Sequence, residues 1–135
     1  MNLKDIVAVS SLAGLYKMVS SRSNGLIIAD LDTGKTRFAA TRKHQFTPLE
    51  SVAIFTDMDS VSLSDIFQTM RDKSATLAVV SAKDPNSEIL SYFKEVLPDY
   101  DKDRVHVSDM KKVIKWYKFL DERGLLAAKS GDEEE

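Results

Sequence analysis

The sequence predicts an α+β fold, with a small N-terminal β-barrel of the SH3 or Sm type followed by a C-terminal helical module. Two observations carry this prediction: turn dipeptides separate short apolar runs before about residue 62, and apolar residues recur at helical spacing after it. The chain of 135 residues, 43% hydrophobic, suits one compact domain or two very small ones. We expect a barrel-like domain over 1–73, a linker or edge strand over 74–83, a helical domain over 84–127 and a disordered acidic tail over 128–135.

The N-terminal half contains the signals of a three-stranded meander. Asn24-Gly25 is a strong hairpin signal, because both residues tolerate the positive φ angles of a type I′ turn. Gly34 suits the left-handed position of a second, bulged turn. An entry segment over 3–9, helical or extended, precedes these strands, and a loop over 42–48 follows them. The strands are expected over residues 15–19, 26–31, 35–41 and 52–56.

Helical periodicity begins near Ser62. Leu63, Ile66, Phe67 and Met70 are spaced as one face of a helix over 62–70. A second helix is expected to begin with Asp84 as N-cap and Pro85 at the first helical position, and to end before Pro98. A third is expected to begin at Ser108, as N-cap, and to end at about Arg123, before Gly124.

Several kinds of chemistry are excluded or disfavoured. The chain has no cysteine, and its two histidines are far apart, so we expect no metal site, no cofactor and no thiol nucleophile. Gly34-Lys35-Thr36 resembles the end of a phosphate-binding loop, but Ala29 stands where that motif needs glycine. Asp99, Asp101 and Asp103 resemble the start of a calcium loop, but Arg104 stands where that loop needs glycine. With no signal peptide and no long apolar segment, we expect a cytoplasmic, non-catalytic protein that does not bind membranes.

The overall net charge of −2 hides a basic hairpin region. Residues 16–45 carry six basic and two acidic side chains, whereas residues 46–73 have a balance of −3. Small barrels bind nucleic acids through basic loops beside an aromatic platform, for which Tyr16 and Phe46 are candidates. In the strand over 35–41, alternation predicts that Arg37 and Lys35 face outward. The cationic candidates are Lys17, Arg22, Lys35, Arg37, Arg42 and Lys43, with His44 beside them.

The expected third helix carries a second candidate surface. A lysine stripe with Phe119 beside it could hold phosphates and stack a base. A solvated face over a buried apolar stripe is the alternative interpretation, because Asp121 and Glu122 partly cancel the charge. The stripe consists of Lys111, Lys115 and Lys118, opposite an apolar arc of Met110, Val113, Ile114, Trp116, Tyr117 and Leu120.

Two segments of the chain resemble a known family. The N-terminal run Leu3-Lys4-Asp5-Ile6, with Gly14-Leu15-Tyr16-Lys17, and the C-terminal run over residues 96–113 are similar to short, uncharacterised Bacteroidetes proteins classed as a domain of unknown function. The resemblance spans most of the chain and ends before the acidic tail. It implies a small β-barrel followed by a helical module, with RNA binding and no catalytic motif.

The functional hypothesis is sequence-tolerant binding of RNA or single-stranded nucleic acid, with the lysines and arginines holding phosphates and Tyr16 or Phe119 stacking. The alternative is a protein-interaction adaptor or a homo-oligomeric structural module, because the net negative charge does not favour nucleic acid and an edge strand can pair with a partner.

Overall fold

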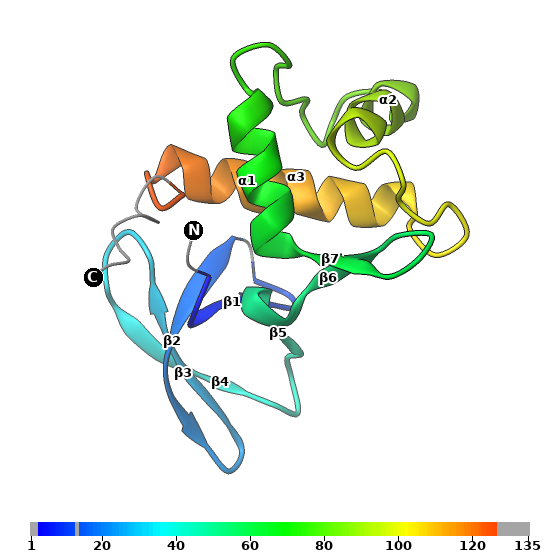
Figure 1. The fold of residues 1–135 in the computed structure, drawn as a ribbon. Helices are drawn as coiled ribbons and strands as arrows, with labels where there is room; N and C mark the ends of the chain where they lie inside the picture. The colour runs from blue at the N-terminus through cyan, green and yellow to red at the C-terminus, as the bar shows by residue number, and fades with distance from the viewer. Residues whose placement is uncertain (1–2, 13, 127–135) are drawn as a thin grey trace. The chain divides into compact units, whose positions relative to one another are not determined.

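The computed structural model describes residues 3–12 and 14–126, so the predicted tail over 128–135 lies outside the described residues (Figure 1). The chain divides into two compact units between Val52 and Ala53. We call residues 3–52 the β unit and residues 53–126 the helical unit. The division falls earlier than the expected boundary at residue 73.

The β unit is a five-stranded antiparallel sheet in the order β4-β3-β2-β1-β5. The edge strands β4 and β5 do not pair with each other within the described residues, so the sheet is open. The α+β class is confirmed, whereas no closed barrel is found within the described residues and the SH3- or Sm-like assignment is not confirmed. The strands are β1 (Ile6–Val9), β2 (Leu15–Arg22), β3 (Gly25–Asp30), β4 (Thr36–Ala40) and β5 (Phe46–Pro48), and a short 3₁₀ turn, η1 (Leu49–Ser51), follows them.

For β1, an extended segment was one of the two alternatives predicted, whereas β5 was not predicted as a strand. The entry segment becomes β1, which lies between β2 and β5 in the sheet. The expected loop over 42–48 ends in β5, where Phe46 lies opposite Val9. Both strands are only three or four residues long, too short to show a two-residue alternation on their own.

The first hairpin turn differs from its prediction. Arg22 and Gly25 are paired, so the two-residue loop is Ser23-Asn24 and Gly25 belongs to β3. Neither Asn24 nor Gly25 has a positive φ angle, so the type I′ expectation is wrong. The expectation for Gly34 is confirmed, since its φ is 77°.

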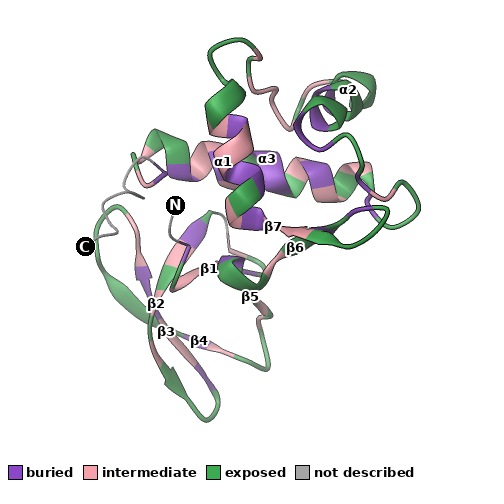
Figure 2. Cartoon of the chain, viewed as in Figure 1, coloured by how far each residue is buried: buried purple, intermediate pink, exposed green. Residues whose placement is uncertain are grey.

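A hydrophobic cluster lies on one side of the sheet of the β unit. Figure 2 marks the buried positions of the strands in purple. Val7, Val9, Ile28 and Ala39 are buried there. Partly buried apolar side chains pack against these four, and we call the whole group the sheet cluster. The partly buried members are Leu12, Tyr16, Met18, Leu26 and Phe46.

The helical unit contains a short hairpin and three helices. The ring of Phe67 on α1 meets that of Tyr117 on α3 edge to face, with 5.7 Å between centroids, which ties α1 to the helical core. Phe93 and Tyr100 meet in the same way, at 5.6 Å. No strand forms over Leu77–Val80, so the edge-strand alternative is wrong. The elements are β6 (Ala53–Phe55), β7 (Ser60–Ser62), α1 (Leu63–Lys73), α2 (Asn86–Val96) and α3 (Val107–Glu122).

The helix starts agree with the sequence at one helix and differ at two. Ser62 caps α1, because its hydroxyl accepts the backbone N–H of Asp65. Asp84 does not cap α2; its carboxylate accepts the N–H of Ser81, and Pro85 is the N-cap. Likewise, α3 begins after His106 rather than at Ser108.

Across the described residues, no helix is both long enough and apolar enough to span a membrane.

Candidate nucleic-acid interface

The side of β2–β4 opposite the sheet cluster, which we call the outer sheet face, presents an exposed aromatic ring. Phe38 on β4 lies opposite Ile27 on β3, and its side chain is 44% exposed. Cross-strand partners point to the same side of a sheet, so Ile27 and Phe38 share the outer sheet face. Figure 1 shows β2, β3 and β4 side by side.

Gly25 explains how this ring is held. A Cβ atom built on Gly25 would lie 2.7 Å from Cζ of Phe38 and would also overlap the carbonyl oxygen of Ala39. The ring of Phe38 therefore lies directly over the backbone of Gly25, which is buried beneath it. An aromatic ring covering a strand glycine is a known device for stabilising a sheet. The arrangement fixes one side of the ring and leaves the other to solvent.

Two cationic side chains share the outer sheet face with Phe38. Lys17 lies opposite Ala29, whose other partner is Thr36 on β4. Arg22 lies opposite Gly25, and its guanidinium donates hydrogen bonds to Ser20 Oγ (3.2 Å) and to the carbonyl of Ser21 (3.3 Å). Both side chains are exposed.

Further cations gather at the hairpin end of the sheet. The N–H of Thr41 donates to the carbonyl of Asn24 (3.0 Å), which brings the loop after β4 beside the β2–β3 turn. That loop carries Arg42 and Lys43, both exposed. We call Lys17, Arg22, Arg42 and Lys43, together with Phe38, the basic sheet surface.

Asp30 and Asp32 lie at the opposite end of the sheet, whereas Asp5 lies beside β2, where its carbonyl oxygen accepts the N–H of Met18 (2.7 Å). The Asp30 carboxylate accepts the N–H groups of Asp32 (2.7 Å) and Thr33 (3.0 Å), so it organises the turn before β4. Lys35 belongs to this turn, and its neighbourhood therefore carries both charges. The hairpin end, from residue 20 to 25 and from 41 to 43, has no acidic residue.

Two predicted site residues point to the other side of the sheet. Tyr16 packs against the sheet cluster and is only partly exposed, so its ring does not lie on the outer sheet face. Arg37 lies opposite Ile28, a buried member of that cluster, and so points to the cluster side of the sheet, where it is exposed as alternation predicted. Alternation correctly predicts that Phe38 and Arg37 point to opposite sides of the sheet. Phe38, however, is not among the aromatic residues predicted to stack on a base.

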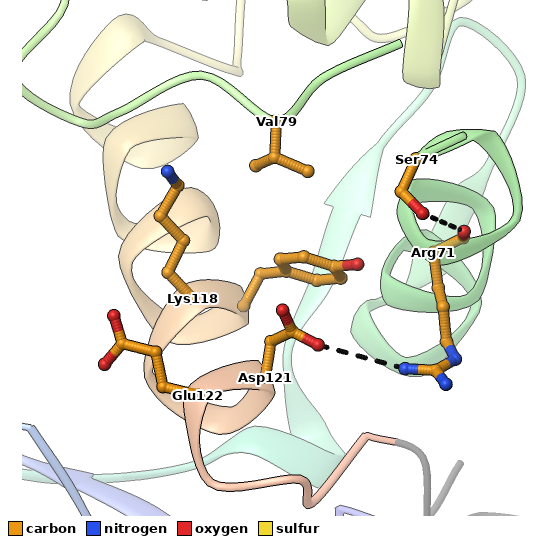
Figure 3. A pocket seen from close by; sticks show the side chains of 7 residues that line it. Arg71, Ser74, Val79, Lys118, Asp121 and Glu122 are labelled. Atoms are coloured by element: carbon orange, nitrogen blue, oxygen red, sulfur yellow. Dashed lines mark hydrogen bonds and ion pairs between the residues drawn. The ribbon is translucent and has the colours of Figure 1, made fainter. Parts of the chain in front are cut away.

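The lysine stripe on α3 belongs to the helical unit and is mixed with acids. Lys118 lines a hollow of about 450 Å³ together with Arg71 and two acids, Asp121 and Glu122 (Figure 3). Arg71 and Asp121 form an ion pair at 3.9 Å. The four charges of this hollow balance, which weakens its attraction for phosphate. Lys115 is exposed, and Lys111 is partly exposed.

Phe119 is not an open platform. Its ring is half-buried, and the guanidinium of Arg123 lies 3.6 Å from the ring centroid. This cation–π contact occupies one face of the ring. The apolar arc of α3 does form the predicted buried face, except that Trp116 is only partly buried.

No group of three or more acidic or histidine side chains in the described part of the chain is arranged to hold a metal ion. His44 instead places Nδ1 2.9 Å from the carbonyl oxygen of Ser10.

Comparison with known proteins places the chain in a family. Residues 52–120 match the model described as domain of unknown function (DUF6852), which covers about half of the chain. The chain belongs to this family. Residues 3–49 match a second domain of unknown function (DUF5606), so the two family segments meet where the structure divides.

A solved structure resembles almost the whole chain. It is a solution NMR structure of a protein from Bacteroides vulgatus, 35% identical, with a TM-score of 0.75. The similarity covers 92% of this chain and 89% of that one. No curated protein matches the chain.

Proposed function

We propose that this protein is a non-catalytic, sequence-tolerant RNA-binding protein that uses the basic sheet surface. The observation that carries the proposal is Phe38, an exposed aromatic ring held over Gly25 on the sheet face that also carries Lys17 and Arg22. Exposed aromatic rings among cations are the usual means by which sheet surfaces bind single strands.

The proposed roles follow from the positions. One base stacks on the free side of Phe38, and phosphates bind the cations around it. Strands lie about 4.8 Å apart, and Lys17 on β2 is in register with Thr36, two residues before Phe38 on β4, so Lys17 and Phe38 are roughly 12 Å apart, a span that a short single strand can bridge. Arg42 and Lys43 extend the path past the hairpin end.

Charge supports this surface over the helical one. Residues 3–52 carry seven basic and four acidic side chains, whereas residues 53–126 carry eleven and thirteen. None of Lys17, Arg42 and Lys43 forms an ion pair within the described residues, so these cations can meet phosphates without breaking one. The contribution of Lys111, Lys115, Lys118 and Phe119, like that of Lys35, Arg37 and Tyr16, stays a prediction, as does an SH3- or Sm-like classification of the sheet.

The test is a fluorescence anisotropy titration of a labelled single-stranded RNA at two salt concentrations. Affinity should fall steeply with salt, because each phosphate contact releases counterions. The variant Arg22→Gln with Arg42→Gln should weaken binding and lower the salt slope by about 1.4, which corresponds to two lost contacts. The matched control, Lys83→Gln with Lys94→Gln, removes the same charge from exposed positions of the helical unit and should bind as the unchanged protein does.

Equal losses in the two variants would show that net charge, rather than the basic sheet surface, governs binding. No binding at low salt would remove the proposal altogether. A parallel titration with single-stranded DNA of the same sequence shows whether the 2′-hydroxyl is recognised.

The alternative is a protein-interaction adaptor, and the open edge of β4 favours it, because an exposed edge can accept a strand from a partner. That function requires the backbone of Thr36–Ala40, whereas RNA binding requires the Phe38 ring. Phe38→Leu should therefore weaken RNA binding about tenfold, as stacking values predict, and leave strand addition intact.

A further inference from the structure

The tip of the β6–β7 hairpin is an exposed apolar surface that the proposed RNA site does not use. Met58 at the tip is 93% exposed, and Phe55 at the end of β6 is 46% exposed. Both line a shallow hollow of about 230 Å³. Single exposed apolar residues are ordinary, but here two of the five large hydrophobic side chains that are exposed in the described residues line one hollow.

The tip is rigidly built. The N–H of Thr56 donates to the carbonyl of Asp59 (2.8 Å), and the N–H of Asp59 donates to Thr56 Oγ (3.0 Å). Thr56 is itself buried and paired with Tyr100, which joins a second segment to the hairpin. These hydrogen bonds close the turn that carries Met58.

The joined segment adds charged side chains to this surface, because Asp101 and Arg104 line the hollow together with Asp57 and Asp59. The N–H of Asp57 donates to the carbonyl of Asp99 (3.0 Å), and the N–H of Asp101 donates to the carbonyl of Phe55 (2.9 Å). Two acidic stretches far apart in the sequence therefore form one surface. These carboxylates are spread out and do not converge as metal ligands would, which suits an extended cationic partner.

An arginine of this chain already binds to the same surface and shows how a cation can be held there. The guanidinium of Arg104 lies 4.8 Å from the centroid of the Phe55 ring, and its Nε lies 3.3 Å from Oδ2 of Asp101. An arginine held between an aromatic ring and a carboxylate is a common recognition geometry. The hydrogen bonds of this tip leave the side chains of Asp57 and Asp59 available for a second such contact.

From this geometry we propose that the β6–β7 tip docks a protein segment in which arginines alternate with apolar residues. The apolar side chains of the partner cover Met58 and Phe55, and its arginines pair with Asp57 and Asp59. The site lies in the helical unit and does not depend on the RNA-binding proposal.

The test uses the full chain and a labelled peptide of alternating arginine and leucine, followed by fluorescence anisotropy. Asp57→Asn with Asp59→Asn should weaken binding about fivefold, because two surface ion pairs are lost. Met58→Ala should weaken it about threefold through lost apolar burial. Thermal melts check that each variant stays folded.

Matched variants on α2 serve as controls. Glu88→Gln with Glu95→Gln removes the same charge from exposed positions, and Leu90→Ala shortens another exposed apolar side chain. Neither should change peptide binding. A peptide of alternating arginine and serine should bind more weakly than the arginine–leucine peptide.

Three results would overturn the proposal: losses in the α2 variants as large as those at the tip, equal binding of the serine peptide, or no binding of either peptide. Self-association of the chain that the tip variants abolish would show that a second copy is the occupant, and would overturn it as well. Phe38→Leu should leave peptide binding unchanged, which separates this outcome from that of the RNA-binding proposal.

Discussion

At the scale of single residues, Gly25 marks a hairpin as predicted, but for a different structural reason than the predicted one. Asn24-Gly25 does mark the hairpin, but Gly25 serves the sheet by lacking a Cβ and not by adopting a positive φ. The ring that requires this space comes from Phe38, on another strand. A rule based on the turn residues alone contains no information on Phe38. The position of the turn could therefore be predicted from the sequence, but the reason for the glycine could not.

Gly25→Ala should therefore cost more stability than Gly34→Ala. A methyl group on Gly25 overlaps backbone and ring atoms, which should cost about 2 kcal/mol through strain. Gly34 has open space around it, so alanine there should lower the free energy of unfolding only through the strain of a left-handed φ, by about 1 kcal/mol. Urea denaturation of both variants measures the difference. If Gly25→Ala is as stable as the unchanged protein, the ring does not lie over Gly25.

Because of Tyr92, the free energy of unfolding should fall at alkaline pH. Burial, with a smaller contribution from Tyr117, raises the pKa of Tyr92 from 10.0 to about 12. The unfolded chain releases this proton above pH 10 and the folded chain retains it, so the contribution to stability is intact below pH 10. It is lost as the pH rises towards 12, by about 2 kcal/mol in total.

Tyr92→Phe tests this directly. The Tyr92 hydroxyl is buried and has no hydrogen-bond partner within the described residues, so its removal should leave stability at neutral pH unchanged or raise it by up to about 1 kcal/mol. The free energy of unfolding of the variant should fall less than that of the unchanged protein between pH 10 and 12. An identical fall in both would contradict the assignment.

At the scale of elements, the helices were predicted better than the strands. The spacing of Leu63, Ile66, Phe67 and Met70 predicted α1, and all four are buried. A helix of eleven residues repeats its pattern several times, whereas β1 and β5 are too short to repeat theirs. Helix ends depend on single hydrogen bonds, and the sequence offered several candidates for each.

The start of α3 gives a prediction that separates two such candidates. The carboxylate of Asp109 accepts the N–H of His106 (3.0 Å), so Asp109→Ala should cost about 1 kcal/mol. Ser108, the cap expected from the sequence, lies inside the helix and is exposed, so Ser108→Ala should change stability by less than about 0.5 kcal/mol. Thermal or urea unfolding measures both, and the reverse ranking would contradict this assignment.

At the scale of the whole molecule, the division of the chain and the distribution of charge coincide. The sequence pattern suggested that the first domain ends near residue 73. In the structure the division comes earlier, and β6, β7 and α1 belong to the helical unit together with α2 and α3. The β unit is basic and the helical unit is acidic. Composition could show the charge difference in advance, but only the register of β2–β4 shows which cations share a face with Phe38.

The most direct test of the RNA-binding proposal is a ¹H–¹⁵N chemical-shift titration of the full chain with a short single-stranded RNA. The largest changes should fall on the backbone amides of Lys17, Ile27 and Phe38 and on the loop that carries Arg42, and they should diminish as salt is added. Changes confined to α3, or no changes at low salt with excess RNA, would contradict the proposal that the outer sheet face binds RNA.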